Sequence, residues 1–305
     1  MIQVTNLTKR YGDKTAVDGI DFTVRPGLVT GFLGPNGAGK STTMRLIVGL
    51  DRATAGTATV SGRRYADLKS PLHEVGVLLD AKAVHTGRSA RNHLRALAAT
   101  HGIPFRRVDD VIDLTGLQTV ADKRVGGFSL GMNQRLGIAA ALLGNPEVLI
   151  LDEPVNGLDP EGVIWVRNLA RDLASQGRTV FLSSHLMSEM ALTADHIIVI
   201  GRGRIIAYAP VAEIIARAAG NTVRVRTPDD RLSAMLTAEG ATVVPTKDGA
   251  LSVSGLMAAR IGDLAAASQI ALHELAPIEA SLEEAYLELT QDQVEYHAGT
   301  NEELA

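Results

Sequence analysis

A glycine-rich segment near the start of the chain has the residue types needed to bind phosphate groups. Its residues are Gly34, Pro35, Asn36, Gly37, Ala38, Gly39, Lys40 and Ser41, with Thr42 directly after them. Glycines let the backbone turn its N–H groups toward the β- and γ-phosphates of a nucleotide, and the positive end of a following helix adds to the attraction. Lys40 can bridge two phosphate oxygens, and the Ser41 hydroxyl can bind Mg²⁺. The segment therefore predicts a site for a nucleoside triphosphate with Mg²⁺.

Two adjacent carboxylates, Asp152 and Glu153, follow an apolar run at 148–151. Asp152 can hold Mg²⁺ through water, and Glu153 can take a proton from the water molecule that attacks the nucleotide. By itself such a pair could also be a solvated turn at the end of a strand. The glycine-rich segment makes the catalytic interpretation the better one.

A third segment, 128–132, contains Ser129 and Gly131 and begins an apolar-periodic stretch typical of a helix. Unpaired N–H groups at a helix N-terminus attract anions, so this segment can contact the γ-phosphate of a nucleotide held by a second copy. Read alone, it is merely a capped helix. Its position about twenty residues before Asp152 favours the phosphate contact.

The elements that would position these residues follow an α/β pattern. Residues 28–33 read as a buried strand that leads into the glycine-rich segment, and 42–50 as the helix after it. Apolar runs at 148–151, 179–182 and 197–200 are separated by helix-length stretches. This rhythm indicates a mostly parallel sheet that is covered on both faces.

The rest of the chain divides into further parts. Helices are predicted at 90–100, 108–115 and 129–143. Beyond residue 219 the order changes to βαββαβ, with a last strand at 270–275 and a helix that starts at Ser281, which suggests a small ferredoxin-like domain. The predicted domains are 1–218 for nucleotide binding, with a helical subdomain at about 82–145, 219–290 for the accessory α+β domain, and 291–305 for a loose acidic tail.

Composition narrows the functional classes. The chain has 305 residues, 46% of them hydrophobic, a formal net charge of −4 and no cysteine, so disulfides, thiolate metal sites and a cysteine nucleophile are excluded. It opens on an alternating strand pattern rather than on a secretory signal, and its longest apolar stretch is too short to cross a bilayer. We therefore expect a cytoplasmic protein, for which a transport function would require a separate membrane chain.

These segments together resemble the ATP-binding subunit of an ABC transporter over about residues 1–215. The matching motifs are Walker A at Gly34–Thr42, the signature at Phe128–Met132, Walker B at Val148–Glu153, the D-loop at Val155–Asp159 and the switch histidine His185. The resemblance implies a P-loop NTPase fold of ABC type, with a mostly parallel sheet, an antiparallel β subdomain and a helical subdomain.

The resemblance also implies roles for single residues. Tyr11 would stack on adenine, His185 would contact the γ-phosphate, and Asp159 would communicate across a dimer interface. Two copies would close head to tail around ATP, with Lys40 and Glu153 in the reaction. This homodimer would drive a separate integral membrane permease, and so lie peripherally on the inner face of the cell membrane.

The sequences at 128–135 and 281–289 are similar to those of ATPases that serve drug, bacitracin and lantibiotic exporters. Export of a drug, an antibiotic peptide or a lipid-like substrate is therefore the favoured function. An importer ATPase and a nucleotide sensor without turnover stay as alternatives. A soluble ABC ATPase acting on ribosomes or nucleic acid is another, although the chain has neither a second cassette nor a long coiled-coil insertion, so no nucleic acid partner is expected.

Two residues depart from the family pattern. Leu130 stands where the signature usually has glycine, and its side chain must point away from the nucleotide. Asp80 stands at the usual glutamine of the Q-loop, where it could bind Mg²⁺ or merely cap the next turn. The segment 81–108 that follows contains basic residues and no acid, and could face the membrane partner or simply be a solvated helix surface.

Overall fold

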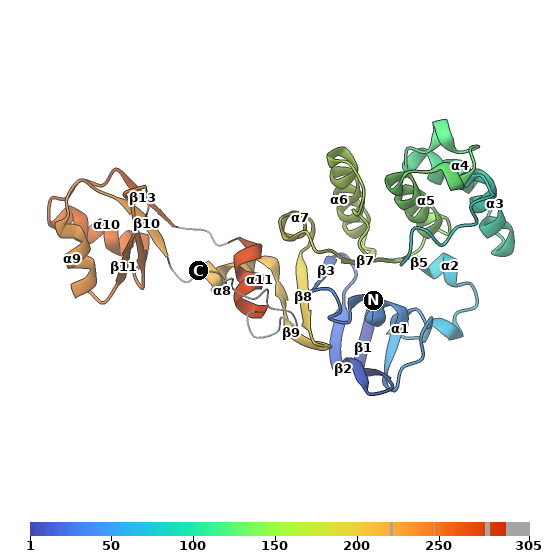
Figure 1. Ribbon diagram of the computed structural model, residues 1–305, viewed down its shortest axis with the longest axis horizontal. Helices are drawn as coiled ribbons and strands as arrows, with labels where there is room; N and C mark the ends of the chain where they lie inside the picture. Colours follow the sequence, from blue (N-terminus) through green and yellow to red (C-terminus); the bar gives the residue numbers. More distant parts are fainter. Residues whose placement is uncertain (220–221, 247, 278–280, 291–305) are drawn as a thin grey trace, which may run out of the picture. The chain divides into compact units, whose positions relative to one another are not determined.

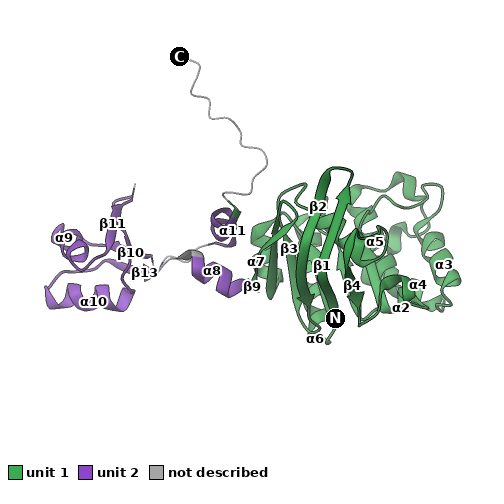
Figure 2. Ribbon diagram, turned by 90° about the horizontal axis from the view of Figure 1, so that it is seen from below, with its two compact units in different colours: residues 1–210, 290–305 green, residues 211–289 purple. Residues whose placement is uncertain are grey.

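The computed structural model describes residues 1–219, 222–246, 248–277 and 281–290. The chain forms two compact units, Met1–Pro210 and Val211–Leu289 (Figure 2). No helix among the described residues is both long and apolar enough to span a membrane. The predicted tail at 291–305 lies outside the described residues.

The first unit is built on a six-stranded sheet with the order β5-β6-β7-β3-β8-β9. Its strands pair in parallel, except that β9 runs antiparallel to β8. β3, β6 and β7 are buried along their whole length, which explains why their sequences read as continuous apolar runs. The strands are β3 (Val29–Leu33), β5 (Val75–Leu78), β6 (Val148–Leu151), β7 (Thr179–Ser183), β8 (His196–Gly201) and β9 (Arg204–Pro210).

A three-stranded antiparallel sheet of order β2-β1-β4 covers one face of this sheet, together with α1. Phe22 of β2 meets Phe32 of β3 and Phe181 of β7, with ring centroids 5.9 and 5.8 Å apart, and these rings join the two sheets in one core. Helices α6 and α7 lie on the opposite side (Figure 1). The bounds are β1 (Ile2–Tyr11), β2 (Lys14–Val24), β4 (Ala55–Val60), α1 (Lys40–Ile47), α6 (Pro160–Ser175) and α7 (Met187–Thr193).

The predicted helical subdomain is present, with α3, α4 and α5 grouped beside β5 (Figure 1). Their ends differ from the predicted ones by no more than two residues at each position. Ser89 caps α3, because its hydroxyl accepts a hydrogen bond from Asn92 N at 3.2 Å. The helices are α2 (Pro71–Glu74), α3 (Ala90–Thr100), α4 (Arg106–Leu114) and α5 (Leu130–Leu142), with short 3₁₀ turns η1 (Tyr65–Asp67), η2 (Gln118–Val120) and η3 (Val125–Gly127).

The second unit contains the predicted βαββαβ order, with an antiparallel sheet β11-β12-β10-β13. Val223 and Val225 of β10 face the core and pack with α9 and α10, as a ferredoxin-like sandwich requires. The elements are α8 (Val211–Ala219), β10 (Val223–Arg226), α9 (Arg231–Ala238), β11 (Thr242–Pro245), β12 (Leu251–Ser254), α10 (Ala258–Ala267), β13 (Glu274–Pro277) and α11 (Leu282–Thr290).

Two local details of the second unit differ from the sequence-based expectation. The last strand begins at Glu274 rather than at residue 270, because Ile270 is a buried loop residue that fills the core after Gln269 adopts a φ of 52°. The second compact unit begins at Val211, so it includes α8. The division into domains at 218/219 stays a prediction.

Candidate nucleotide site

The glycine-rich segment forms the connection between β3 and α1. Gly39 has a φ of 110° and is the residue before the helix, and a Cβ at this position would lie 2.6 Å from Ala16 O. Only glycine fits there. The helix therefore starts at Lys40, two residues earlier than predicted, and no side chain caps it and no acid lies in its first turn. Its N–H groups are thus available to an anion.

Lys40 is held inside the curve of this segment. Its side chain is 7% exposed, and Nζ donates to Gly34 O at 2.6 Å. Burial lowers the pKa of Lys40, while the charges of Glu153 and Asp152 act in the opposite direction. The amine therefore lies within electrostatic reach of both predicted carboxylates. The glycine-rich segment after β3 and the carboxylates after β6 follow parallel strands on either side of β7, so they lie at the same edge of the sheet.

The predicted carboxylates meet the end of β7 through Ser183. Its hydroxyl donates to Asp152 Oδ1 at 2.5 Å and accepts from the backbone N of Glu153 at 2.9 Å. Sequence reasoning missed Ser183, which is fully buried at the last position of β7. Its place two residues before His185 was the available signal. One hydroxyl thus holds the carboxylate of Asp152 and the backbone N–H of Glu153.

His185 and Glu153 are in direct contact. His185 Nδ1 lies 2.8 Å from Glu153 Oε2, and the imidazole itself is exposed. The prediction assigned His185 to the γ-phosphate. That role stays a prediction, since one ring nitrogen contacts the carboxylate and the other nitrogen is left for a ligand. A carboxylate oriented in this way can receive a proton from a bound water molecule.

The signature residues are arranged at the start of α5. Ser129 is the N-cap, and its hydroxyl accepts from Met132 N at 3.2 Å. Leu130 is 46% exposed. Within the described part of the chain, Ser129 and Gly131 make no hydrogen bond to the glycine-rich segment. The structure therefore does not join these residues to the nucleotide segment of the same copy.

The other predicted residues have partners that the sequence did not reveal. The Tyr11 hydroxyl donates to Asp51 at 3.0 Å, Lys9 Nζ lies 4.6 Å from the ring centroid, and burial followed by the bond to Asp51 raises the pKa of Tyr11. Asp159 caps α6 by accepting from Gly162 N at 2.9 Å. Tyr11 is still half-exposed, so it can offer a ring face to a base.

Of the two roles expected for Asp80, Mg²⁺ binding and capping of the next turn, the structure shows the capping contact. Its Oδ1 accepts from Lys82 N at 2.8 Å, and the side chain is exposed directly after β5. No cluster of three or more His, Asp or Glu side chains that could hold a metal occurs in the described residues. The oxygen donors Ser41 and Asp152 suit Mg²⁺, which commonly takes its other ligands from phosphate and water.

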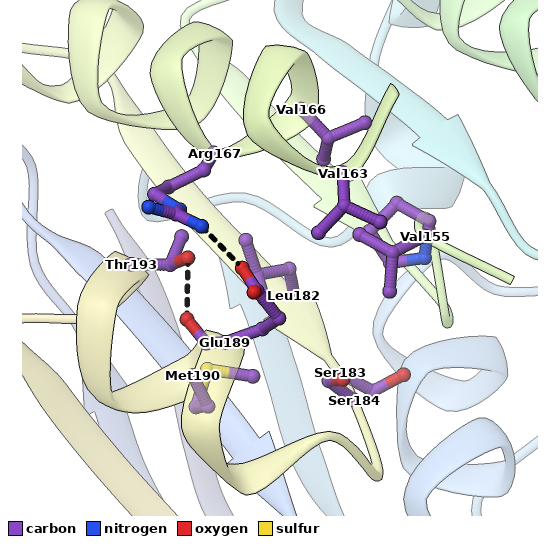
Figure 3. Close-up of a pocket in the computed structure, with 11 residues that line it drawn as sticks. Val155, Val163, Val166, Arg167, Leu182, Ser183, Ser184, Glu189, Met190 and Thr193 are labelled. Carbon is purple, nitrogen blue, oxygen red and sulfur yellow. Dashed lines mark hydrogen bonds and ion pairs between the residues drawn. The ribbon is translucent and has the colours of Figure 1, made fainter. Parts of the chain in front are cut away.

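A small cavity of about 20 Å³ lies behind β7, between α6 and α7. Figure 3 shows the Arg167 guanidinium and the Glu189 carboxylate facing each other across it, with Nη2 and Oε2 2.8 Å apart. The cavity is too small for a nucleotide. Its ion pair ties the helix that follows Asp159 to the helix that follows His185.

The glycine-rich segment between β3 and α1 (the phosphate loop), the carboxylates Asp152 and Glu153 after β6, and the separate helical subdomain define a P-loop ATPase. Comparisons with known proteins define the family. A family described as ABC transporter matches residues 17–156, and a family described as a domain of unknown function matches residues 221–283.

Two curated relatives extend this match. The bacitracin transport ATP-binding protein BcrA of Bacillus licheniformis is 42% identical over 213 residues, which are 69% of this chain and 70% of that protein. The uncharacterized ABC transporter ATP-binding protein YhcH of Bacillus subtilis (strain 168) is 34% identical over 301 residues, covering 95% and 96% of the two chains.

The solved structure of an ATP binding subunit of an ABC transporter superposes with a TM-score of 0.63 at 26% identity, covering 71% of this chain and 92% of that one. The chain therefore belongs to the ABC transporter family as an ATP-binding subunit, and it is an ATPase.

Proposed function

We propose that this chain is the ATP-hydrolysing subunit of an exporter, which works as a head-to-tail homodimer on a separate integral membrane permease. The observation that carries the proposal is the arrangement of Lys40, Glu153 and His185 at one edge of the sheet, while Ser129 and Gly131 make no described hydrogen bond to the glycine-rich segment of the same copy. Each copy would thus supply two parts of two different sites. One part is the group that binds and hydrolyses its own ATP, and the other is the helix start that would contact the ATP of the partner copy.

The reaction follows from the contacts of the first half. Lys40 binds the β- and γ-phosphates in place of Gly34 O, and the N–H groups at the start of α1 share the negative charge. Glu153 takes the proton of the attacking water, and His185 orients the carboxylate through their 2.8 Å contact. Ser41 and Asp152 would hold Mg²⁺, which supplies further neutralisation of the phosphates when it is bound.

The second half is supplied by the partner copy. Ser129 and Gly131 at the start of α5 would contact the γ-phosphate, because the helix end presents N–H groups to it. Tyr11 would stack on adenine with the ring face that Lys9 does not cover. ATP then holds the two copies together, and hydrolysis releases them. This cycle would change the conformation of the permease.

A groove beside the Q-loop position supports docking of the permease. It encloses about 460 Å³, and its lining combines apolar side chains, such as Leu72 and Leu97, with His93 and Asp80. Burial lowers the pKa of His93. A largely apolar groove of this size suits the apolar face of a helix from another chain.

Fewer of the positive charges in the basic segment 81–108 are free to attract a membrane partner than its sequence indicates. Arg91 pairs with both Asp109 and Asp122, so its charge is used inside the helical subdomain. Arg95 lies 5.9 Å from the ring centroid of the exposed Phe105. We therefore assign the proposed attraction to acidic loops or headgroups to Arg88 and Arg95, and Arg91 to the stability of the fold.

The identity of the exported compound and the location rest on relatives. BcrA is a bacitracin transport ATP-binding protein, which supports a drug, an antibiotic peptide or a lipid-like compound as the substrate. On this proposal the chain is bound to the inner face of the cell membrane through its permease.

The test is to purify tagged, full-length Glu153→Gln protein from native membranes in the presence of ATP, since loss of the base should trap the closed dimer. We expect a polytopic membrane protein to be retained in stoichiometric amount. Lys40→Ala, which cannot hold the phosphates, serves as the control and should retain less of it. Retention of ribosomes or nucleic acid instead, or of no partner, would contradict the transporter proposal.

A further inference from the structure

We propose that Gln134 is a positioning residue for Glu153, and that it links the start of α5 to the base of the same protomer. The inference rests on the proposed role of Glu153 as the base. Nothing in the sequence singled out Gln134, which lies five residues after Ser129 on the same helix. Its contacts are what distinguish it.

Gln134 is a buried amide with one well-defined partner. Its side chain is 4% exposed, and Nε2 donates to the backbone carbonyl of Glu153 at 2.8 Å, across 19 residues of sequence. A buried amide is costly unless it is hydrogen-bonded, so this contact fixes the helix and the loop against each other.

Glu153 needs such support because its backbone is in an unfavourable conformation. Its φ is 49°, in the left-handed region that side chains other than glycine rarely adopt. Conformations of this kind persist where the surroundings hold them from several sides. Here Ser183 binds the N–H of Glu153 while Gln134 and Asn156 N bind its carbonyl, the latter at 3.2 Å. Both peptide groups of the residue are thus held, which directs its carboxylate toward His185.

A second contact joins α5 to the same loop. The side chain of Leu130 covers Gly157, since a Cβ at Gly157 would lie 2.4 Å from Leu130 Cδ2. Gly131 is also close, because a Cβ there would lie 2.8 Å from Gly157 O. Leu130, which departs from the usual glycine, therefore points at the D-loop. The first two turns of α5 touch residues 153–157 at two places, through Leu130 and through Gln134.

This arrangement has a consequence for the dimer. Ser129 would engage ATP held by the partner, while Gln134 on the same helix holds the base that acts on the protomer's own ATP. If α5 moved on contact with the partner's ATP, Gln134 would move with it, and its hydrogen bond would displace the backbone of Glu153. Occupancy of one site would in this way set the geometry of the base in the other.

The test compares ATP turnover by full-length Gln134→Met protein with wild type. Methionine keeps the volume and removes the donor. We expect kcat to fall by on the order of 100-fold, as for a reacting group displaced by about 1 Å, with KM for ATP unchanged. Gln118→Met is the matched control, because it removes an exposed amide-to-carbonyl bond (Nε2 to Asp113 O, 3.2 Å) in the same helical subdomain and should leave kcat unchanged.

Two further measurements separate positioning from a merely structural role. In the Glu153→Gln background, Gln134→Met should leave ATP-induced dimerisation intact, as followed by light scattering. It should also cause no further loss of the residual hydrolysis, as followed in single-turnover assays with labelled ATP. Additive losses, or loss of the ATP-induced dimer, would overturn the inference. Should Gln134→Met fail to fold, Gln134→Leu, which also lacks the donor, is measured in its place with the same expected outcomes.

The outcomes distinguish this inference from the function on which it rests. If Glu153→Gln alone retains wild-type turnover, the proposed role of Glu153 is wrong, and the inference fails with it. If Glu153→Gln abolishes turnover but Gln134→Met has wild-type kcat, the role of Glu153 stands and the inference alone is overturned.

Discussion

The two compact units use their charged and polar side chains in opposite ways. In the first unit, Lys40, Gln134 and Ser183 are buried, and each binds a backbone group or a carboxylate near the end of a strand. Gln134 and Ser183 hold Glu153 in a left-handed backbone conformation that side chains other than glycine rarely adopt.

In the second unit the charges lie on the sheet surface and satisfy one another. Arg224 and Arg226 alternate with the buried Val223 and Val225 on β10, so they lie on the face that the helices do not cover. Both arginines pair with Asp248 and Glu274. Such exposed ion pairs contribute little to stability. We therefore expect substitutions of the polar groups that support the backbone of Glu153 to lower turnover, and substitutions of the exposed ion pairs on β10 to leave turnover unchanged.

The largest effect is expected for Glu153→Gln in the first unit. Loss of a general base should lower kcat by roughly 10³-fold while ATP binding is kept. The measurements are phosphate release and titration with a fluorescent ATP analogue. Glu161→Gln, in the exposed first turn of α6, is the matched control. A kcat within about tenfold of wild type would show that another group accepts the proton.

A smaller effect is expected for Ser183→Ala, which removes the hydroxyl between Asp152 and Glu153. The partly buried N–H of Glu153 would lose its acceptor, at a cost of about 1–3 kcal/mol in the free energy of unfolding. If about 1.4 kcal/mol of this appears in the transition state, kcat falls about tenfold. Urea unfolding and steady-state assays measure the two effects. Ser175→Ala, which removes an exposed bond to Asp172 O, should change neither.

Asp80→Gln should have a smaller effect still. The carboxylate is exposed and already accepts a bond from Lys82 N, so removing its charge should change kcat by less than about fivefold, the equivalent of 1 kcal/mol. An increase in kcat would agree with the loss of electrostatic repulsion between the Asp80 carboxylate and the phosphates. Asp113→Asn on α4 is the control. If Asp80→Gln matched the loss of Glu153→Gln, Asp80 would be essential, and the comparison between buried and exposed groups would fail.

The smallest effect is expected for Asp248→Asn in the second unit. The hydrogen bond from Thr246, followed by the neighbouring Arg224, holds the pKa of Asp248 well below its usual value. A lowered pKa means that the folded state binds the proton less tightly than the unfolded state. The stabilisation is therefore present above the unfolded pKa of about 3.9 and is lost as the pH falls through the lower folded pKa.

Urea midpoints at neutral pH and below about pH 4 measure this dependence. Wild type should lose more of its stability over this range than Asp248→Asn, and ATP turnover at neutral pH should be the same for both. A reduced turnover in Asp248→Asn would give the second unit a part in catalysis and would contradict the expectation that its exposed ion pairs leave turnover unchanged.

Much of the fold could be predicted because it depends on short-range patterns. Continuous apolar runs such as 148–151 and 179–182 indicated strands buried on both faces, and periodicity located the three helices of the helical subdomain to within two residues. The error at Ile270 has the same origin. A buried loop residue and a strand residue are equally apolar, so the pattern alone does not separate them.

The sequence alone determined the location of the segment whose own backbone N–H groups would bind phosphate. The phosphate loop consists of consecutive residues, and Gly39 ends it because its φ of 110° excludes a side chain. Only the tertiary structure decided how Glu153 is held. Gln134, Ser183 and His185 lie 19 to 32 residues away from it, on α5, at the end of β7 and after β7. Their hydrogen bonds exist because α5, β6 and β7 pack together, and the direction and distance that such bonds require are set by that packing rather than by any spacing along the chain.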